Sequence, residues 1–187
     1  MFKRFSTSDC STSTQIKSSA QRGIKAKIQE TFPGLDEAMI DVLLPKKPPL
    51  VQYKAPGLTI FCTGGSENVP LFYQHRDWDD VVLPTLKFVH KYPDLPWTKV
   101  TVDKGAIPFV LGGANIMCPG LTNPGGEIED GLQKGQAVII MAEGKEHAIA
   151  VGKLKISSED IRTKNKGIGI EVAHYLGDKL FELSEIC

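Results

Sequence analysis

The segment Val102–Gly135 holds the residues whose types and spacing best fit a ligand bound through the backbone. Glycine, proline and asparagine lie between its expected secondary-structure elements, with short apolar stretches separating them. Because glycine has no side chain and permits positive φ, a ligand can approach the main chain closely there. Gly112-Gly113 and Pro119-Gly120 flank an expected strand. This spacing of residue types predicts the first part of a compact, β-rich RNA-binding barrel and not the active-site loop of an enzyme.

Cysteine and histidine offer the alternative chemistry. Cys118 as a nucleophile with His147 as its base is one hypothesis, since a catalytic thiol needs a positioned base and a depressed pKa. A small apolar residue within a strand is the ordinary alternative. The histidines, which are His75, His90, His147 and His174, lack the spacing of a metal site. No nucleotide-hydrolysing P-loop motif is present either, so we expect no catalysis, no metal and no cofactor.

The charge of the chain gives no bulk support for nucleic-acid binding. The 22 lysine and arginine residues balance 22 aspartate and glutamate residues. Residues 1–94 hold 12 basic and 10 acidic side chains, and the rest of the chain holds 10 and 12. Any RNA contact must therefore come from a local patch or from shape. A solvated, mixed-charge surface fits the totals equally well.

The compartment is predicted from what the sequence lacks. No apolar run approaches the roughly 18 residues of a transmembrane helix. No apolar stretch follows Lys3 and Arg4, as it would in a secretory signal. The 4 cysteines form no CxxC pair, which predicts no disulfide framework and a reducing compartment. We therefore expect a cytoplasmic protein without a membrane segment.

A long amphipathic helix is expected near the start of the chain. Residues 1–12 are expected to form a short strand or an arm and then a loop. A helix over Thr14–Phe32 is predicted by an apolar stripe made of Ile16, Ala20, Ile24, Ile28 and Phe32. Four basic side chains lie off this stripe, namely Lys17, Arg22, Lys25 and Lys27. They indicate either a solvated helix face or a docking surface for rRNA or a protein partner.

The rest of the first half completes an α/β domain over residues 1–94. A shorter helix is expected over Leu35–Leu44, and a further helix around Leu83–His90 has Pro84 in its first turn. Three short strands are expected between these helices, over Leu50–Tyr53, Leu58–Cys62 and Val69–Gln74. The proline-rich segment Tyr92–Pro96 breaks the pattern and is the expected domain boundary.

Residues 95–187 have the texture of a small barrel. Expected strands cover Thr98–Val102, Asn115–Cys118, Gln136–Ala142, Ala148–Ile156, Ile168–Ile170 and Lys179–Leu183. Asp103 caps a short helix that runs through Leu111. A second helix covers Ser157–Lys164, where Ser157 and Asp160 approximate a capping box.

Residues 97–183 resemble a PUA domain, an RNA-binding module found in pseudouridine synthases and archaeosine transglycosylases. The resemblance rests on an ordered series of segments, which are Val102–Ala106, Gly113–Gly120, the hairpin Val138–Gly152, Ile156–Asp160 and Gly167. In this family RNA contacts the first helix, the second strand and a nearby hairpin. Carried over by position, the resemblance implies RNA contacts at Lys104, Gly105, Gly113, Asn115 and Lys145.

These residue types suit RNA. Lysine supplies a mobile cation for phosphate, and asparagine both donates and accepts at a base edge or 2′-hydroxyl. The alternative is that Gly105 and Gly113 are turn residues and Lys104 is merely solvated. Aromatic side chains could stack on bases or fill the core, the candidates being Tyr73, Trp78 and Trp97.

The whole chain is similar to the malignant T-cell-amplified sequence 1 family. The similar segments are MFKRF, Phe72–Arg76, Pro84–Leu86, His90–Pro93, Val102–Ile107, Met141–Lys145 and Lys164–Glu171. The resemblance implies a translation factor that binds the small ribosomal subunit and pairs with density-regulated protein. It also implies a role in initiation, in reinitiation and in the recycling of deacylated tRNA.

Two departures from the family pattern bear on the RNA-facing surface. Pro108 lies inside the expected helix after Asp103, where it costs ~3 kcal/mol or more unless it occupies the first turn. We therefore expect that helix to begin later or to be distorted. The segment Asn123–Gly135 is more acidic and richer in glycine than the family pattern.

We thus predict a two-domain α+β protein, with an α/β domain over 1–94 and a PUA pseudo-β-barrel over 95–187. Its expected partners are small-subunit rRNA, tRNA and a density-regulated protein homologue. Two alternatives remain open. One is a PUA factor of ribosome biogenesis that binds pre-rRNA, and the other is an RNA-modifying enzyme, for which the first 94 residues offer little room.

Overall fold

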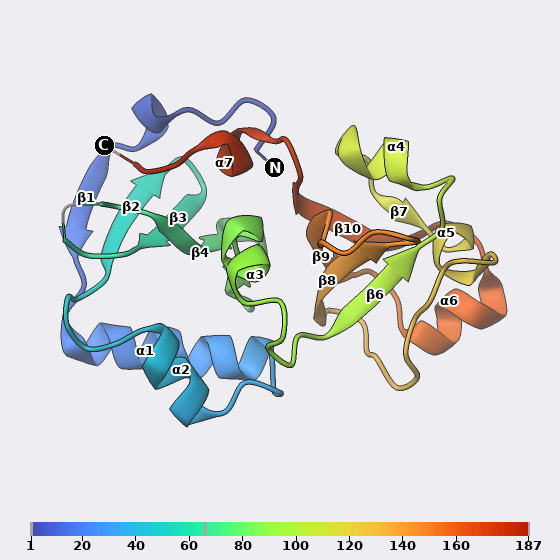
Figure 1. The fold of residues 1–187 in the computed structure, drawn as a ribbon, viewed down its shortest axis with the longest axis horizontal. Helices are drawn as coiled ribbons and strands as arrows, with labels where there is room; N and C mark the ends of the chain where they lie inside the picture. The colour runs from blue at the N-terminus through green and yellow to red at the C-terminus, as the bar shows by residue number, and fades with distance from the viewer. Residues whose placement is uncertain (1, 66, 187) are drawn as a thin grey trace.

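The computed structural model describes residues 2–65 and 67–186, which form two lobes that lie side by side (Figure 1). Each lobe is built on a five-stranded sheet with short helices around it, so the predicted α+β class is confirmed. Within the described residues, no helix combines the length and the apolarity that crossing a membrane requires.

The N-terminal lobe has the strand order β1-β2-β3-β4-β5, with every neighbouring pair antiparallel. The strands are β1 (Thr12–Gln15), β2 (Val51–Ala55), β3 (Leu58–Cys62), β4 (Pro70–His75) and β5 (Leu83–Pro84). The helices are α1 (Ser18–Thr31), α2 (Glu37–Leu43) and α3 (Leu86–Lys91), and the 3-10 turns are η1 (Thr7–Asp9) and η2 (Arg76–Trp78). In the view of Figure 1, α1 and α2 lie below the sheet.

The C-terminal lobe has the strand order β6-β8-β9-β10-β7, in which only the β6–β8 pair is parallel. The strands are β6 (Lys99–Val102), β7 (Ile116–Met117), β8 (Ala137–Ala142), β9 (Ala150–Leu154) and β10 (Ile168–Tyr175). The helices are α4 (Ile107–Leu111), α5 (Pro119–Thr122), α6 (Ser158–Lys164) and α7 (Lys179–Glu182).

Side-chain caps explain where several of these helices begin. Asp36 accepts a hydrogen bond from the Met39 amide at 2.8 Å at the start of α2. Ser157 accepts one from the Asp160 amide at 3.2 Å at the start of α6, as the sequence predicts. Each cap satisfies a backbone donor that has no partner within the helix.

The first helix begins later than the apolar stripe predicts. α1 starts at Ser18, because Thr14 and Gln15 belong to β1 and pair with residues of β2. Ile16 is buried ahead of the helix, whereas Ala20, a predicted member of the stripe, is exposed. The expectation of a helix from Thr14 is therefore wrong at its start, since pairing with a distant strand overrides the local period.

Two further expectations need correction. Pro84 lies in β5 and not in a helix; α3 begins two residues later, where Thr85 accepts a hydrogen bond from the Phe88 amide at 3.3 Å. Residues Lys179–Glu182, expected as the end of the barrel, form α7, and Asp178 caps it by accepting from the Phe181 amide at 3.0 Å. β10, which runs to Tyr175, instead pairs with both β9 and β7 in this sheet.

The sheet of the C-terminal lobe is buried on both faces. Successive side chains of a strand point to opposite faces. In β8, Ala137 and Ile139 join a hydrophobic core that the N-terminal lobe shares, while Val138 and Ile140 fill a second core inside the C-terminal lobe. The shared core also takes Trp97 and the tail residue Ile186. One continuous apolar cluster therefore joins the two lobes.

Polar contacts reinforce this junction. Lys153 of β9 forms an ion pair with Asp80 at 2.5 Å, and its ammonium lies 5.8 Å from the centroid of the Trp78 ring. His90 of α3 hydrogen-bonds through Nε2 to the carbonyl oxygen of Ala148 at 2.8 Å. The chain after β10 returns to the N-terminal lobe, where the Ile186 amide donates a hydrogen bond to the backbone carbonyl oxygen of Asn68 at 3.0 Å.

The shared core predicts that the two lobes unfold together. We expect Ile139→Ala to cost about 2–5 kcal/mol of unfolding free energy, because it removes a fully buried side chain from this core. Urea unfolding should give the same midpoint by tryptophan fluorescence, which reports Trp78 and Trp97, and by far-ultraviolet circular dichroism. Val42→Ala is the control, since Val42 is 80% exposed and its truncation should change stability by less than about 0.5 kcal/mol. Two separated transitions would contradict a common core.

Candidate nucleic-acid interface

The loop between β6 and α4 carries Lys104 and Gly105, and two carboxylates hold it in place. Asp103 accepts hydrogen bonds from the Ala106 amide at 2.7 Å and from Asn123 Nδ2 at 2.9 Å. Glu143, just beyond β8, accepts from the Lys104 amide at 3.1 Å. The Lys104 side chain is exposed. Its backbone is therefore fixed while its ammonium remains available to a ligand.

Gly105 has no structural need to be glycine. A Cβ atom built there would meet only Asp103 Oδ1, at an ordinary distance of 3.4 Å. The residue is also exposed. Its lack of a side chain therefore leaves the backbone open to close approach, which is what an RNA-contacting glycine offers.

The helix α4 presents an apolar surface that the sequence analysis missed. It begins at Ile107, so Pro108 falls in its first turn, and the late start expected from this proline is confirmed. Val110 is buried in the second core, while its neighbour Phe109 is 67% exposed. Met117 in β7 is 50% exposed. The available signal was the helical spacing, since burial of Val110 turns its neighbour Phe109 outward.

Gly113 and Asn115 follow α4, and both have structural roles. Gly113 has φ of +75°, and a Cβ atom there would lie 2.6 Å from Tyr175 Cε1 and 2.7 Å from Lys3 Cε. Asn115 is exposed, and its side-chain oxygen accepts from the Val172 amide at 3.0 Å. Gly113 is thus required by its turn and its neighbours. Asn115 keeps its amide donors for a ligand.

Lys145 lies at the same end of the sheet as Lys104. It is exposed in the turn after β8, where its amide donates to the Ala142 carbonyl at 3.0 Å. Glu143 links this turn to the β6–α4 loop through its hydrogen bond to the Lys104 amide. The structure therefore brings these two predicted lysines to neighbouring loops, while Gly113 and Asn115 lie at the far end of α4. A five-residue helix separates the two sets by about 7.5 Å of axial rise.

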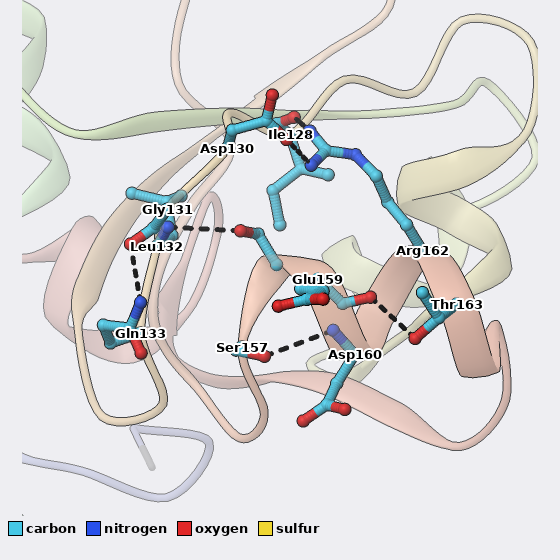
Figure 2. Close-up of polar contacts among 11 residues, drawn as sticks. Ile128, Asp130, Gly131, Leu132, Gln133, Ser157, Glu159, Asp160, Arg162 and Thr163 are labelled. Atoms are coloured by element: carbon cyan, nitrogen blue, oxygen red, sulfur yellow. Dashed lines mark hydrogen bonds and ion pairs between the residues drawn. The ribbon is translucent and has the colours of Figure 1, made fainter.

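The acidic segment Asn123–Gly135 is fastened to α6. Figure 2 shows Arg162 of α6 between Asp130, with which it forms an ion pair, and the carbonyl oxygen of Ile128. The Leu132 amide donates to Ser158 Oγ at 3.1 Å. One carboxylate of the segment is thus paired within the lobe, while the first residue of the segment, Asn123, contacts Asp103 in the loop before α4.

The four cations predicted on α1 fall into two pairs. Lys25 forms an ion pair with Asp41 of α2 at 2.6 Å, and Lys27 donates to the carbonyl oxygen of Asp79. Lys17 and Arg22 are exposed, and no ion pair is found for them in the part of the chain that the structure describes. Only the second pair is left free for rRNA or a partner.

The thiol chemistry weighed for Cys118 does not fit its surroundings. The side chain is fully buried, and burial raises the pKa of the thiol. Its Sγ donates to the Lys166 carbonyl at 3.4 Å, whereas His147 is exposed and packs against His90 at 5.2 Å between ring centroids. A nucleophile needs the opposite, an accessible thiol with a lowered pKa. Among the described residues no group of three or more potential metal ligands is found.

Comparison with known proteins places both halves of the chain. Residues 5–93 match the Pre-PUA-like domain family, and residues 98–176 match the PUA domain family. Translation machinery-associated protein 20 of Schizosaccharomyces pombe is 48% identical over 183 residues, which is 97% of this chain and 98% of that protein. The malignant T-cell-amplified sequence 1 homologue of Drosophila melanogaster is also 48% identical, over 97% of both chains. Human malignant T-cell-amplified sequence 2 is 45% identical over 98% of each.

Solved structures show the same fold at lower identity. A hypothetical protein from Pyrococcus horikoshii matches with a TM-score of 0.73 and 22% identity, covering 92% of this chain and 99% of that one. A conserved PUA domain protein from Thermoplasma acidophilum matches with a TM-score of 0.65 and 20% identity, covering 91% and 97%. The predicted pairing of an N-terminal α/β domain with a C-terminal PUA fold is confirmed. The division at residue 94 stays a prediction.

The geometry of Gly113 predicts a specific stability loss. We expect Gly113→Ala to destabilise the fold by more than Gly144→Ala, by about 1 kcal/mol or more, because both glycines have positive φ but only Gly113 is crowded. Gly144 has no atom within 4 Å of a built Cβ, so it isolates the backbone strain. Urea unfolding of both variants measures the difference. Equal losses would mean that the contacts with Tyr175 and Lys3 carry no energetic weight.

Proposed function

This chain belongs to the family of malignant T-cell-amplified sequence 1 and translation machinery-associated protein 20, and on that premise we propose a non-catalytic translation factor that binds the small ribosomal subunit. The observation that carries the proposal is the surface around α4. There two exposed lysines on linked loops, Lys104 and Lys145, lie in the same PUA module as the exposed ring of Phe109.

This surface suits single-stranded RNA. Proteins recognise unpaired RNA by stacking bases on aromatic side chains and by contacting the sugar–phosphate backbone. In this arrangement Phe109 stacks on a base, and Lys104 and Lys145 contact phosphates. The amide of Asn115 donates to a base edge or a 2′-hydroxyl. The proposed ligand is rRNA on the small subunit or the unpaired end of a tRNA.

The N-terminal lobe supplies the second contact. We assign Lys17 and Arg22 to docking on rRNA or on a density-regulated protein homologue, because both are exposed and lack ion pairs among the described residues. The shared core holds this surface and the α4 surface in one fixed relation. Two weak sites on one rigid body give a combined affinity that neither gives alone. Reinitiation and recycling of deacylated tRNA are the processes in which such a factor would act.

Removal of the two lysines tests the phosphate contacts. Lys104→Ala combined with Lys145→Ala should weaken small-subunit binding and reduce the slope of log affinity against log salt by about 1–2, because each lysine that contacts a phosphate releases a counterion. The measurement is co-sedimentation with purified small subunits over a range of salt. Lys134→Ala removes one exposed lysine before β8, at the opposite end of the parallel β6–β8 pair, and should leave binding unchanged. An unchanged slope in the double variant would reject the assignment.

Phe109 tests the stacking contact separately. Phe109→Ala should cost about 1–3 kcal/mol of RNA binding without changing the salt slope, because stacking involves no counterion release. Fluorescence anisotropy with a labelled single-stranded RNA measures both quantities. Val42→Ala is the matched control, since it truncates an exposed apolar side chain in the other lobe. A Phe109→Ala variant with native affinity would show that the exposed ring does not meet RNA.

Two measurements separate this function from its alternatives. Affinity purification from a lysate at moderate salt should recover mature small subunits and a density-regulated protein homologue. Co-migration with large-subunit precursors instead would favour ribosome biogenesis. Turnover of a modified nucleoside by the purified protein, abolished by a single Asp→Ala change, would establish an RNA-modifying enzyme.

A further inference from the structure

Phe2 is buried at the junction of the two lobes. Phe2 is 1% exposed, and its ring meets Tyr73 of β4 edge-on at 5.0 Å and His174 of β10 at 5.6 Å between centroids. Its carbonyl oxygen accepts from the Lys179 amide at 3.3 Å. Because these contacts come from both lobes, the position of residue 2 is fixed relative to both.

Because Phe2 is fixed in this position, the side chain of the next residue, Lys3, lies against the PUA domain at Gly113. The Cε atom of Lys3 lies 2.7 Å from where a Cβ of Gly113 would stand, and the Tyr175 ring lies equally close to the same point. Gly113 is the turn residue between α4 and β7. The lysine stem therefore passes over a position that is free only because residue 113 has no side chain.

The charge at the end of that stem is available. Lys3 is exposed, and no ion pair is found for it in the described residues. A lysine can lay its hydrocarbon stem on an aromatic surface and keep its ammonium in water. Here Cε of Lys3 and the ring of Tyr175 both lie against Gly113, and the ammonium, one bond beyond Cε, lies near the turn that joins α4 to Asn115.

We propose that Lys3 belongs to the RNA-binding surface, where its ammonium contacts a backbone phosphate beside the nucleotide held by Phe109 and Asn115. This inference rests on the proposed function of the α4 surface and extends it to a residue of the other lobe. Lys104 and Lys145 lie toward the start of α4, and Lys3 lies at its end. The RNA would thus pass between cations supplied at both ends of the helix.

The test is the salt dependence of RNA binding by the full chain. Lys3→Ala should weaken binding of a labelled single-stranded RNA oligonucleotide roughly fivefold at ~0.1 M salt and lower the salt slope by about 0.7, the value for one contact with single-stranded nucleic acid. Lys3→Arg keeps the charge and should keep the slope. Lys134→Ala removes the same charge elsewhere and should change neither quantity. Because Lys3 is exposed, each variant should melt at the native temperature.

The possible outcomes separate this inference from the function on which it rests. Native affinity and slope in Lys3→Ala, with loss in the Lys104→Ala and Lys145→Ala double variant, would overturn the role of Lys3 and leave the function standing. Equal losses in Lys3→Ala and Lys134→Ala would also overturn it, since net charge alone would then explain the effect. A native chain that does not bind the oligonucleotide would overturn the RNA-binding function itself.

Discussion

The burial of one sheet on both faces is the constraint on which the rest of the structure depends. β8 sends Val138 and Ile140 into the core of its own lobe and Ala137 and Ile139 into the core shared with the N-terminal lobe. A sheet with two apolar faces is stable in water only when both are covered. The N-terminal lobe therefore acts as the missing layer of the barrel, and the two domains are one body in energetic terms.

Ionisable side chains are buried at this junction. His174 and Asp178 are fully buried or nearly so, and Nδ1 of His174 lies 2.8 Å from the Asp178 carboxylate, which also accepts from the Tyr175 amide at 3.1 Å. Burial, assisted by Asp178, holds the pKa of Tyr73 well above its usual range. Tyr73 therefore stays neutral, and its ring packs edge-on against the ring of Phe2. The same cluster thus fixes the position of Phe2 at the junction of the two lobes.

The sequence predicted those parts of the fold that local signals determine. The strand over Leu58–Cys62 was predicted at its observed bounds, and the helix after Ser157 within one residue, because alternation and a side-chain cap are local properties. Local sequence signals gave the wrong secondary structure where pairing with a distant strand determines the conformation. Thr14 was expected to begin the helix, yet it lies in β1 and pairs with Gln52 of β2. A strand was expected over Lys179–Leu183, but Asp178 caps a helix there.

The candidate surface was predictable only in part for the same reason. The lysines of the β6–α4 and β8–β9 loops were found by resemblance, and their exposure agrees with a binding role. The exposure of Phe109 was not found, because it depends on which side of a five-residue helix faces the core. The approach of Lys3 to Gly113 has no local sequence signal at all, since it follows from the packing of two lobes. Sites composed across a domain junction are therefore the part of function that sequence patterns reveal least.

The neutral charge of the chain does not oppose RNA binding once the charges are sorted by what they contact. Lys25 and Lys153 are held in ion pairs with Asp41 and Asp80, so those cations are engaged within the fold. Lys104 and Lys145 are exposed without such partners among the described residues. Because salt screens charges beyond about 8 Å, a phosphate at the α4 surface would respond to these cations and to the neighbouring Asp103 and Glu143, and little to more distant carboxylates. Recognition then depends on placement, which the shared core supplies, and not on net charge.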